Sequence, residues 1–576
     1  MTVIEPKGPE VPAKRPRRAH AAELSAFGEP FLWAHGGALA IGIVLIIGFL
    51  VLVLWNGIAT FWPRPVAVVT LEDGSLVAGE PSRTEPFRPG PELLSSLSET
   101  QRQTVAAADG WAERRLYRIG NYDLYNEDFR WIADYAVARV DYPPEMVFVE
   151  RLEWGPFVGM VQALAVGGET RTAASLRPGE LQSELAKAQD RWQRIRHIER
   201  SLIGAVNHEM ERERLAVRRA ILDHGAGSPA ALAAQAAAER RMKPLEERYQ
   251  ALAAEARAIK DADAAVTITL ADVGGRDKTM PLSQVVRIYA ANDLSLIEKL
   301  GVYVSRWWEF LSEEPREANT EGGVFPAIFG TFAMTLLMVI VVAPFGVITA
   351  LYLREYAKQG RLVSIVRISV NNLAGVPSIV YGVFGLGFFA YILGGSIDDL
   401  FYPERLPSPT FGTGGLLWAS LTLALLTVPV VIVATEEALA AVPRSMREGS
   451  LACGASKWQT IRNIVLPRAM PGILTGLILA MARGAGEVAP LMLVGVVKLA
   501  PELPIDGYFP YVHLERSFMH LGFHIYDVGF QSRNSEAGKP MVFVTTLLLI
   551  GLVAAMNATA IVIRNRLKRK FAVGHF

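Results

Sequence analysis

Residues 444–471 read RSMREGSLACGASKWQTIRNIVLPRAMP, a basic and polar stretch between two long apolar runs. Ser445 and Glu448 have the spacing of a capping box, which predicts that a short helix begins here. Gly454 suits the left-handed position just beyond a helix end, because glycine adopts a positive φ without steric cost. The first half of the stretch therefore predicts a short helix followed by a sharp bend.

The second half of this stretch predicts another helix. Ser456 and Gln459 repeat the spacing of a capping box. Trp458 and Ile461, three residues apart, are expected on one face of that helix. Pro467 is expected to break the helix and lead into the next apolar run.

Six apolar runs are long enough to cross a bilayer as helices, which takes about 20 residues. They are residues 32–55, 324–353, 368–393, 416–438, 472–497 and 541–563. The sequence therefore predicts an all-α polytopic membrane protein. The run at 32–55 is too long for the apolar core of a cleavable signal, and no small-residue cleavage site follows it.

Basic residues alternate with the apolar runs in a way that orients them. The basic segments are the N-tail (Lys14, Arg15, Arg17, Arg18), the loop after the second run (Arg354, Lys358, Arg361, Arg367), the loop after the fourth (Arg444, Arg447, Lys457, Arg462, Arg468) and the C-tail (Arg564, Arg566, Lys568, Arg569, Lys570). Alternate crossing puts all four on one side, and short basic loops mark the cytoplasmic side. Both termini are thus expected in the cytoplasm.

This orientation divides the chain into segments. They are a cytoplasmic N-tail at 1–31, a first span at 32–55, a periplasmic domain at 56–320, a five-helix membrane domain at 324–563 that contains a cytoplasmic loop at 436–471, and a basic tail at 564–576. The composition fits this class, with 51% hydrophobic residues among 576. The net charge of +1 gives no reason to expect nucleic acid, and a single cysteine excludes a disulfide framework.

The periplasmic insert is expected to be α+β. Strand formers fill residues 66–77, around the turn Asp73-Gly74, and residues 147–164. Residues 179–261 show helical spacing on both sides of a turn at 223–229, which predicts an antiparallel helical hairpin. Pro244 should kink or interrupt its second helix. The insert is either a spacer or a docking surface for an extracytoplasmic partner, and the sequence leaves both readings open.

The loop that begins at Glu448 resembles the signature of ABC importer permeases, EAA-x3-G-x9-I-x-L-P. The matching residues are Glu448, Gly454, Ile464, Leu466 and Pro467, while Gly449 and Ser450 replace the two alanines. The resemblance implies a coupling helix that sits in a groove of an ATPase subunit. A P-loop needs Gly-Lys followed by Ser or Thr, whereas Pro540 follows the one Gly-Lys of this chain. ATP hydrolysis, the only cofactor chemistry expected, is therefore assigned to a partner dimer.

Polar residues inside two of the runs suggest the substrate. Asn371, Asn372 and Ser378 lie in the third run, and Arg483 with Glu487 lies in the fifth. The stretch from about 324 to 563 resembles the A-type permeases of phosphate-specific transport (PstA-type), in an extended form with a periplasmic domain. That resemblance implies a second homologous (PstC-type) permease, a periplasmic phosphate-binding protein and surrounding lipid as partners.

The charge pair itself favours an anion. An arginine at bilayer depth costs ~2.5–3.5 kcal/mol or more unless it faces a partner or a cavity. Arg483 and Glu487 are four residues apart, so one helix face can hold both. A guanidinium fork matches phosphate in a bidentate way that lysine cannot. The alternative is a structural ion pair that only fixes helix packing.

Three histidines in the last periplasmic loop, His513, His520 and His524, do not form a recognised metal motif, so no metal is expected. Other functions left open are a permease for another oxyanion or small solute, a membrane sensor with a periplasmic domain, and an intramembrane enzyme. The last is weakest, because the sequence has no nucleophile–base set and no His-Glu-x-x-His.

Overall fold

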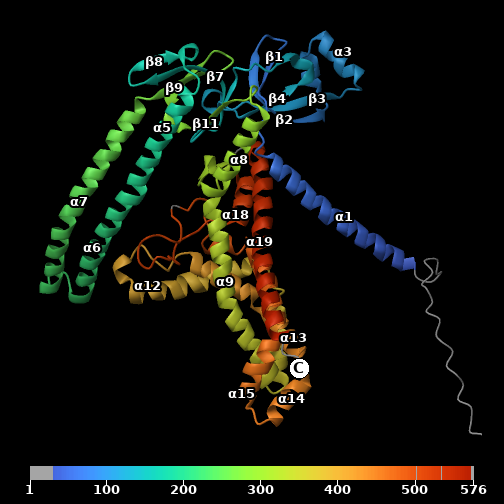
Figure 1. Ribbon diagram of the computed structural model, residues 1–576, viewed down its shortest axis with the longest axis vertical. Helices are drawn as coiled ribbons and strands as arrows, with labels where there is room; N and C mark the ends of the chain where they lie inside the picture. Colours follow the sequence, from blue (N-terminus) through green and yellow to red (C-terminus); the bar gives the residue numbers. More distant parts are fainter. Residues whose placement is uncertain (1–29, 501, 533–534, 573–576) are drawn as a thin grey trace, which may run out of the picture. The chain divides into compact units, whose positions relative to one another are not determined.

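The computed structural model describes residues 30–500, 502–532 and 535–572, in two compact units, Met1–Trp55 and Asn56–Phe576 (Figure 1). The basic N-tail at Lys14, Arg15, Arg17 and Arg18 lies outside the described residues. In the first unit, the predicted run at 32–55 belongs to one helix, α1 (Pro30–Ala59). It is apolar around its whole circumference, as a helix surrounded by lipid must be.

The insert domain, residues 56–322 in the second unit, contains two antiparallel sheets that frame its core. The first sheet has the order β4-β3-β2-β1-β5, and the second has the order β10-β9-β7-β6-β11 with β8 beside β7. Their bounds are β1 (Ala67–Leu71), β2 (Leu76–Phe87), β3 (Ala112–Arg118), β4 (Phe129–Ala133), β5 (Val137–Asp141), β6 (Val147–Arg151), β7 (Phe157–Val166), β8 (Glu169–Thr172), β9 (Thr267–Ala271), β10 (Asp277–Pro281) and β11 (Val285–Ala290). Short helices α2 (Pro91–Ser96), α3 (Glu99–Ala107) and α4 (Tyr122–Tyr125) fill the connections. The α+β expectation is confirmed, including the turn at Gly74, where φ is 80°.

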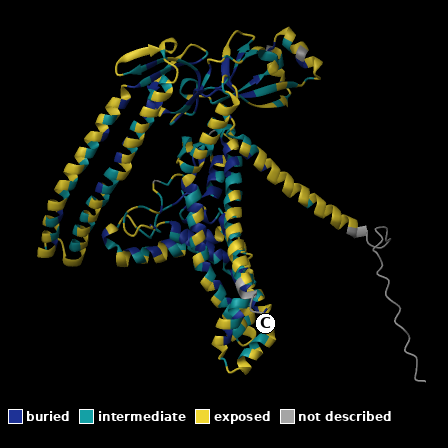
Figure 2. Ribbon diagram, in the orientation of Figure 1, coloured by how far each residue is buried: buried dark blue, intermediate teal, exposed yellow. Residues whose placement is uncertain are grey.

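A helical hairpin leaves the second sheet between β8 and β9. It consists of α5 (Glu180–Arg196), a π-helical segment (His197–Leu202), α6 (Ile203–His224) and α7 (Pro229–Ala264). The helices α6 and α7 lie side by side and stay mostly exposed or half-buried along their length (Figures 1 and 2). Pro244 does not interrupt α7, because alanine and glutamate, both strong helix formers, continue the helix on either side.

Asn121 joins the two halves of the insert. This buried side chain accepts a hydrogen bond from the Val158 N–H at 2.8 Å and donates one to the Val158 carbonyl at 2.9 Å. Its own backbone has a φ of 56°, a conformation that asparagine tolerates better than most residues. Asn121 thus completes both backbone bonds of a strand residue that would otherwise be buried without partners.

We expect Asn121→Leu to destabilise the insert domain by ~2–4 kcal/mol, because the Val158 N–H and carbonyl would remain buried and unpaired. Differential scanning calorimetry of the purified chain should show a lower first transition. The matched control is Asn207→Leu, on the exposed face of α6. Equal transitions for both variants would contradict the assignment.

The membrane domain follows α8 (Leu296–Ser312) and a small hairpin, β12 (Pro315–Arg316) and β13 (Glu321–Gly322). Its helices are α9 (Phe325–Leu351), α10 (Arg361–Leu373), α11 (Ser378–Phe384), α12 (Gly395–Phe401), α13 (Leu416–Ala440), α14 (Arg444–Ala452), α15 (Lys457–Thr460), α16 (Leu466–Gly486), α17 (Leu491–Val494), α18 (Leu521–Tyr526) and α19 (Ser535–Ala572). The helix α13 is central, packing against both α9 and α16.

The described residues contain six helices long and apolar enough to cross a membrane, as predicted. They are Trp33–Ala59, Phe325–Tyr356, Ser378–Phe401, Leu416–Ala440, Lys457–Gly486 and Ser535–Arg569. Several boundaries differ from the sequence expectation, most of all in the third and fifth spans. The third span begins at Ser378, because the chain breaks at residues 374–377 ahead of it. The fifth span begins at Lys457 and ends at Gly486, because the predicted break at Pro467 does not occur.

Candidate functional site

The loop between α13 and α16 bends sharply at Gly454, as predicted. The helix α14 ends at Ala452, and Gly454 has a φ of +84°. The Gly454 N–H donates to the Leu451 carbonyl and the Ala455 N–H donates to the Ser450 carbonyl, the two bonds of a Schellman motif. The predicted capping box at Ser445 is wrong, because α14 begins one residue earlier, at Arg444, directly after Pro443.

The second helix of the loop continues into the membrane. Ser456 and Gln459 form the predicted capping box at the start of α15. A π-helical segment, Ile461–Val465, then leads into α16 without a break. Pro467 lies in the first turn of α16, where a proline is tolerated.

Trp458 and Ile461, three residues apart, differ in burial. Trp458 is 54% exposed, whereas Ile461 is 1% exposed. Ile464, Leu466 and Pro467 are half-buried between these extremes. Ile464, Leu466 and Pro467, the three apolar residues of the signature, therefore help to pack the loop against the rest of the chain, while Trp458 remains at the surface.

Long-range contacts hold the loop in place, and no motif in the sequence predicted them. Arg447 pairs with Glu355, just beyond α9, at 3.1 Å and donates to the Leu439 carbonyl in α13 at 2.6 Å. Lys457 donates to the Glu355 carbonyl. The Ser450 and Thr460 hydroxyls, one on each side of the bend, are 2.9 Å apart. The bend is thus fixed to the ends of two membrane helices.

The outer face of this loop is free to contact another protein. Glu448, Gly449, Leu451 and Trp458 are exposed. A side-chain carbon added at Gly449 would meet no atom within 4 Å, so glycine is not required there by packing within this chain. The exposed face combines one carboxylate with two apolar side chains on a rigid bend, a surface suited to a shaped groove.

Arg483 and Glu487 form the predicted ion pair, with the Arg483 Nε and Glu487 Oε1 atoms 3.6 Å apart. They do not belong to one continuous helix, because α16 ends at Gly486 and Glu487 has extended backbone. Their side chains are 37% and 22% exposed in this chain. Both charges therefore lie at a surface of the membrane domain in this chain.

Glycine packing fixes the position of this pair. A carbon added at Gly484 would lie 2.4 Å from the Met338 Sδ in α9. The end of α16 consequently lies close to α9, and a larger residue at Gly484 would require the Met338 side chain to move.

The other predicted path residues lie around the break between α10 and α11. Asn371 and Asn372 are exposed on α10, and Ser378 is half-buried at the first position of α11. The Tyr381 hydroxyl donates to the Leu373 carbonyl at 2.6 Å, which satisfies a carbonyl at the broken helix end. The break that precedes the third span is thus bridged by a hydrogen bond from α11 to the end of α10.

Asn371 does not join the Arg483–Glu487 pair. It lines a separate cavity of about 210 Å³ with Arg367 and Glu436. Arg367 and Glu436 pair at 3.1 Å between α10 and α13. Asn371 and the Arg483–Glu487 pair, all predicted to line the substrate path, therefore lie at two separate places. The Arg367–Glu436 pair beside Asn371 was not predicted from the sequence.

The three histidines of the last loop have different surroundings. His513 bonds Asp506 at 2.8 Å and Glu515 at 3.1 Å. His520 and His524 are buried outside the spans, and burial lowers the pKa of each to about 4. Within the described ranges, no three His, Cys, Asp or Glu side chains are grouped as metal ligands.

Known proteins match the part of the chain that carries this geometry. Residues 342–569 match the family described as binding-protein-dependent transport system inner membrane component. The phosphate transport system permease protein PstA 1 of Mycobacterium tuberculosis is 33% identical over 261 residues, which is 45% of this chain and 76% of PstA 1. The chain belongs to this family of ABC transporter permeases.

One more relative and one solved structure are similar to parts of the chain. The probable ABC transporter permease YqgH of Bacillus subtilis is 35% identical over 209 residues, 36% of this chain and 63% of YqgH. A chain of the inward-facing MetNI methionine ABC transporter covers 42% of this permease and 97% of its own length, at 20% identity and a TM-score of 0.30. The family match begins at residue 342, so the two sheets and the hairpin lie outside it.

Proposed function

We propose that this permease is the A-type membrane subunit of an ATP-driven importer that carries inorganic phosphate into the cytoplasm. The observation that carries the proposal is Arg483, an arginine near the end of the fifth span, within the stretch that matches the family. Inorganic phosphate is an anion that hydrocarbon excludes unless donors and positive charge compensate. A guanidinium half-exposed at a subunit surface supplies both.

The partners follow from the same geometry. The exposed face of the bend, Glu448 to Trp458, would dock on an ATP-binding cassette dimer, which hydrolyses ATP while this chain binds no cofactor. The exposed sides of Arg483 and Glu487 would face a second, homologous PstC-type permease. A periplasmic phosphate-binding protein would deliver the substrate. A sensor role is not favoured, because relatives of this chain are transport permeases.

The orientation that we propose places both termini in the cytoplasm and residues 56–320 in the periplasm. Cys453, the single cysteine, is exposed in the coupling bend and serves as a natural probe. A membrane-impermeant maleimide should leave Cys453 unmodified in intact cells and modify it after permeabilisation. In the Cys453→Ala background, Ala226→Cys in the hairpin turn should react in intact cells. Labelling of Cys453 from outside would contradict this orientation.

Uptake measurements test the substrate. Cells whose chromosomal copy is deleted should lose high-affinity uptake of labelled phosphate and regain it on complementation. Uptake of another oxyanion, with phosphate uptake unchanged by the deletion, would refute the proposal.

A further inference from the structure

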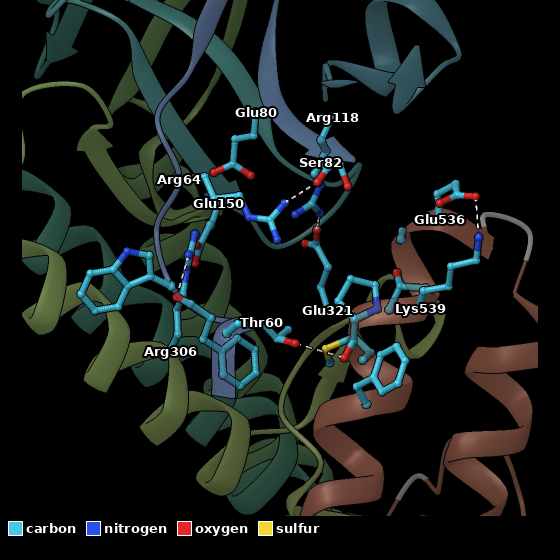
Figure 3. A pocket seen from close by; sticks show the side chains of 18 of the residues that line it. Thr60, Arg64, Glu80, Ser82, Arg118, Glu150, Arg306, Glu321, Glu536 and Lys539 are labelled. Carbon is cyan, nitrogen blue, oxygen red and sulfur yellow. Dashed lines mark hydrogen bonds and ion pairs between the residues drawn. The ribbon is translucent and has the colours of Figure 1, made fainter. Parts of the chain in front are cut away.

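A cavity of about 440 Å³ lies at the base of the insert domain (Figure 3), and neither Arg483 nor Glu487 lines it. Its walls come from residues 56–64, from β2, β3 and β6, from α8 and β13, and from the first turns of α19. The apolar run of the last span begins at Met541, which lines the cavity. The cavity therefore lies at one end of the last candidate span, where a membrane protein is expected to meet lipid headgroups.

The lining is rich in charge. Five arginines and one lysine face five glutamates, so the cations are in excess. Most of these groups are already paired across the cavity wall. The pairs are Arg306–Glu150 and Arg118–Glu321, both at 2.5 Å, Arg316–Glu309 at 2.5 Å, Arg83–Glu536 at 3.1 Å and Lys539–Glu536 at 2.7 Å. The network leaves one arginine and one glutamate without a charged partner.

Arg64 is the arginine that remains. Its Nη1 atom donates to the Pro81 and Ser82 carbonyls at 3.2 and 3.3 Å, and in the described part of the chain its guanidinium contacts no carboxylate. Figure 3 shows the guanidinium lying in the cavity. Arg64 thus keeps a full positive charge and unused N–H donors, since a guanidinium has five.

Glu80 is the glutamate that remains. It is 9% exposed, and none of the described residues forms an ion pair or hydrogen bond with its carboxyl group. Burial raises the pKa of Glu80, even though Arg306, Arg118 and Arg64 act in the opposite direction. Glu150 differs, because Arg306 and Arg287 outweigh its burial and lower its pKa. A neutral Glu80 carboxyl can donate a hydrogen bond into the cavity.

We propose that this cavity binds a phosphate group, with the Arg64 guanidinium as the charged donor and the buried Glu80 carboxyl as the second donor. The excess of cations favours an oxyanion, and a phosphate offers acceptors for both donors at once. Either a phospholipid headgroup or inorganic phosphate supplies this chemistry. The site is separate from the transport path and does not depend on the proposed transport function.

Binding to the purified full-length chain tests the site with two probes. In the first arm, native mass spectrometry measures retention of phosphatidylglycerol. In the second, isothermal titration calorimetry measures binding of inorganic phosphate to the delipidated chain. We expect Arg64→Gln to weaken binding about tenfold, the loss of one charge-assisted hydrogen bond. Glu80→Gln, which keeps a neutral donor, should retain binding, and Glu80→Ala should weaken it.

The pH dependence of phosphatidylglycerol retention tests whether the Glu80 carboxyl takes part in binding. Because the pKa of Glu80 is raised, lower pH keeps it neutral, and a rise in pH through that pKa places a carboxylate beside the bound anion. Retention of phosphatidylglycerol should therefore fall more steeply with rising pH in the wild type than in Glu80→Gln, where Glu321, whose pKa burial also raises, still titrates in the cavity. A phosphodiester keeps one charge over this range, so the ligand adds no titration of its own.

The matched control is Arg139→Gln, an exposed arginine of β5 that pairs with Asp141. If Arg64→Gln and Glu80→Ala weaken only the retention of phosphatidylglycerol, the cavity is a site for a lipid headgroup. If they weaken only the binding of inorganic phosphate, the cavity is a site for free phosphate. If Arg64→Gln, Glu80→Ala and Arg139→Gln all bind both probes as the wild type does, the proposal is overturned. These readouts need no partner subunit, so they stand apart from any uptake measurement.

Discussion

Arg483→Gln should reduce uptake of labelled phosphate by about a hundredfold or more, at matched expression and in cells lacking other phosphate transporters. Glutamine keeps hydrogen-bond donors but removes the positive charge, and a bidentate charge-assisted contact is worth roughly 3 kcal/mol. Arg483→Lys should recover little, because an ammonium group cannot reproduce the fork. Arg566→Gln, an exposed position near the end of α19, is the control for expression and insertion.

Glu487→Gln should also impair uptake, by a different route. The Arg483 guanidinium, 3.6 Å from Glu487, would lose the carboxylate that shares its charge and would hold the anion too tightly for release. The apparent affinity for phosphate should then rise while the maximal rate falls. This opposite change in the two parameters distinguishes Glu487→Gln from Arg483→Gln.

The double variant Arg483→Gln/Glu487→Gln separates a substrate role from a structural one. If the pair only fixes the end of α16, two neutral amides can still bond each other and uptake should return. If Arg483 serves the anion, the double variant should stay as inactive as Arg483→Gln. Recovery of uptake would remove Arg483 from the transport path.

The second large effect is expected at the coupling bend. Gly454→Val places a β-branched residue at a φ of +84°, which costs ~1–2 kcal/mol or more in backbone strain. A side-chain carbon at this position meets no atom within 4 Å, so the strain, and not a clash, would open the bend. We expect the variant to insert normally, to lose most of the ATPase subunit on co-purification, and to lose uptake with it.

Gly449→Ala is the matched control for this experiment. Gly449 is equally open but lies within α14, where alanine is a better helix former and fits the family signature. The Gly449→Ala variant should retain the ATPase subunit on co-purification. Trp458→Ala should weaken ATPase binding without strain, because it removes an exposed ring from the contact face. Normal ATPase binding by Gly454→Val would show that the bend is not the coupling element.

Local chemistry explains which features the sequence predicted. The bend at Gly454, the capping box at Ser456 and the apolar spans each depend on neighbouring residues alone, and the structure contains all of them. Membership of the permease family was also predicted, because the loop signature has a fixed spacing.

Features that depend on distant contacts were not predictable. Arg447 is anchored by Glu355, 92 residues away, and Arg367 by Glu436, 69 residues away. Pro244 and Pro467 were expected to break helices that continuous neighbouring turns preserve. Ser445 failed as a cap because Pro443 sets the helix start one residue earlier. Glu487 reached Arg483 from beyond the helix end, which helical spacing does not describe.

The hairpin of the insert domain has a mechanical consequence. Its helix α6 packs on residues 403–405 in the loop before α13, and the His208 ring stacks on Tyr508 in the last loop at 4.5 Å. The helix α7, with 36 residues, is about 54 Å long, so each degree of rotation at its base moves its tip by about 1 Å. A tilt of one degree at the base of the hairpin would therefore displace its far end, where α6 contacts residues 403–405, by about 1 Å.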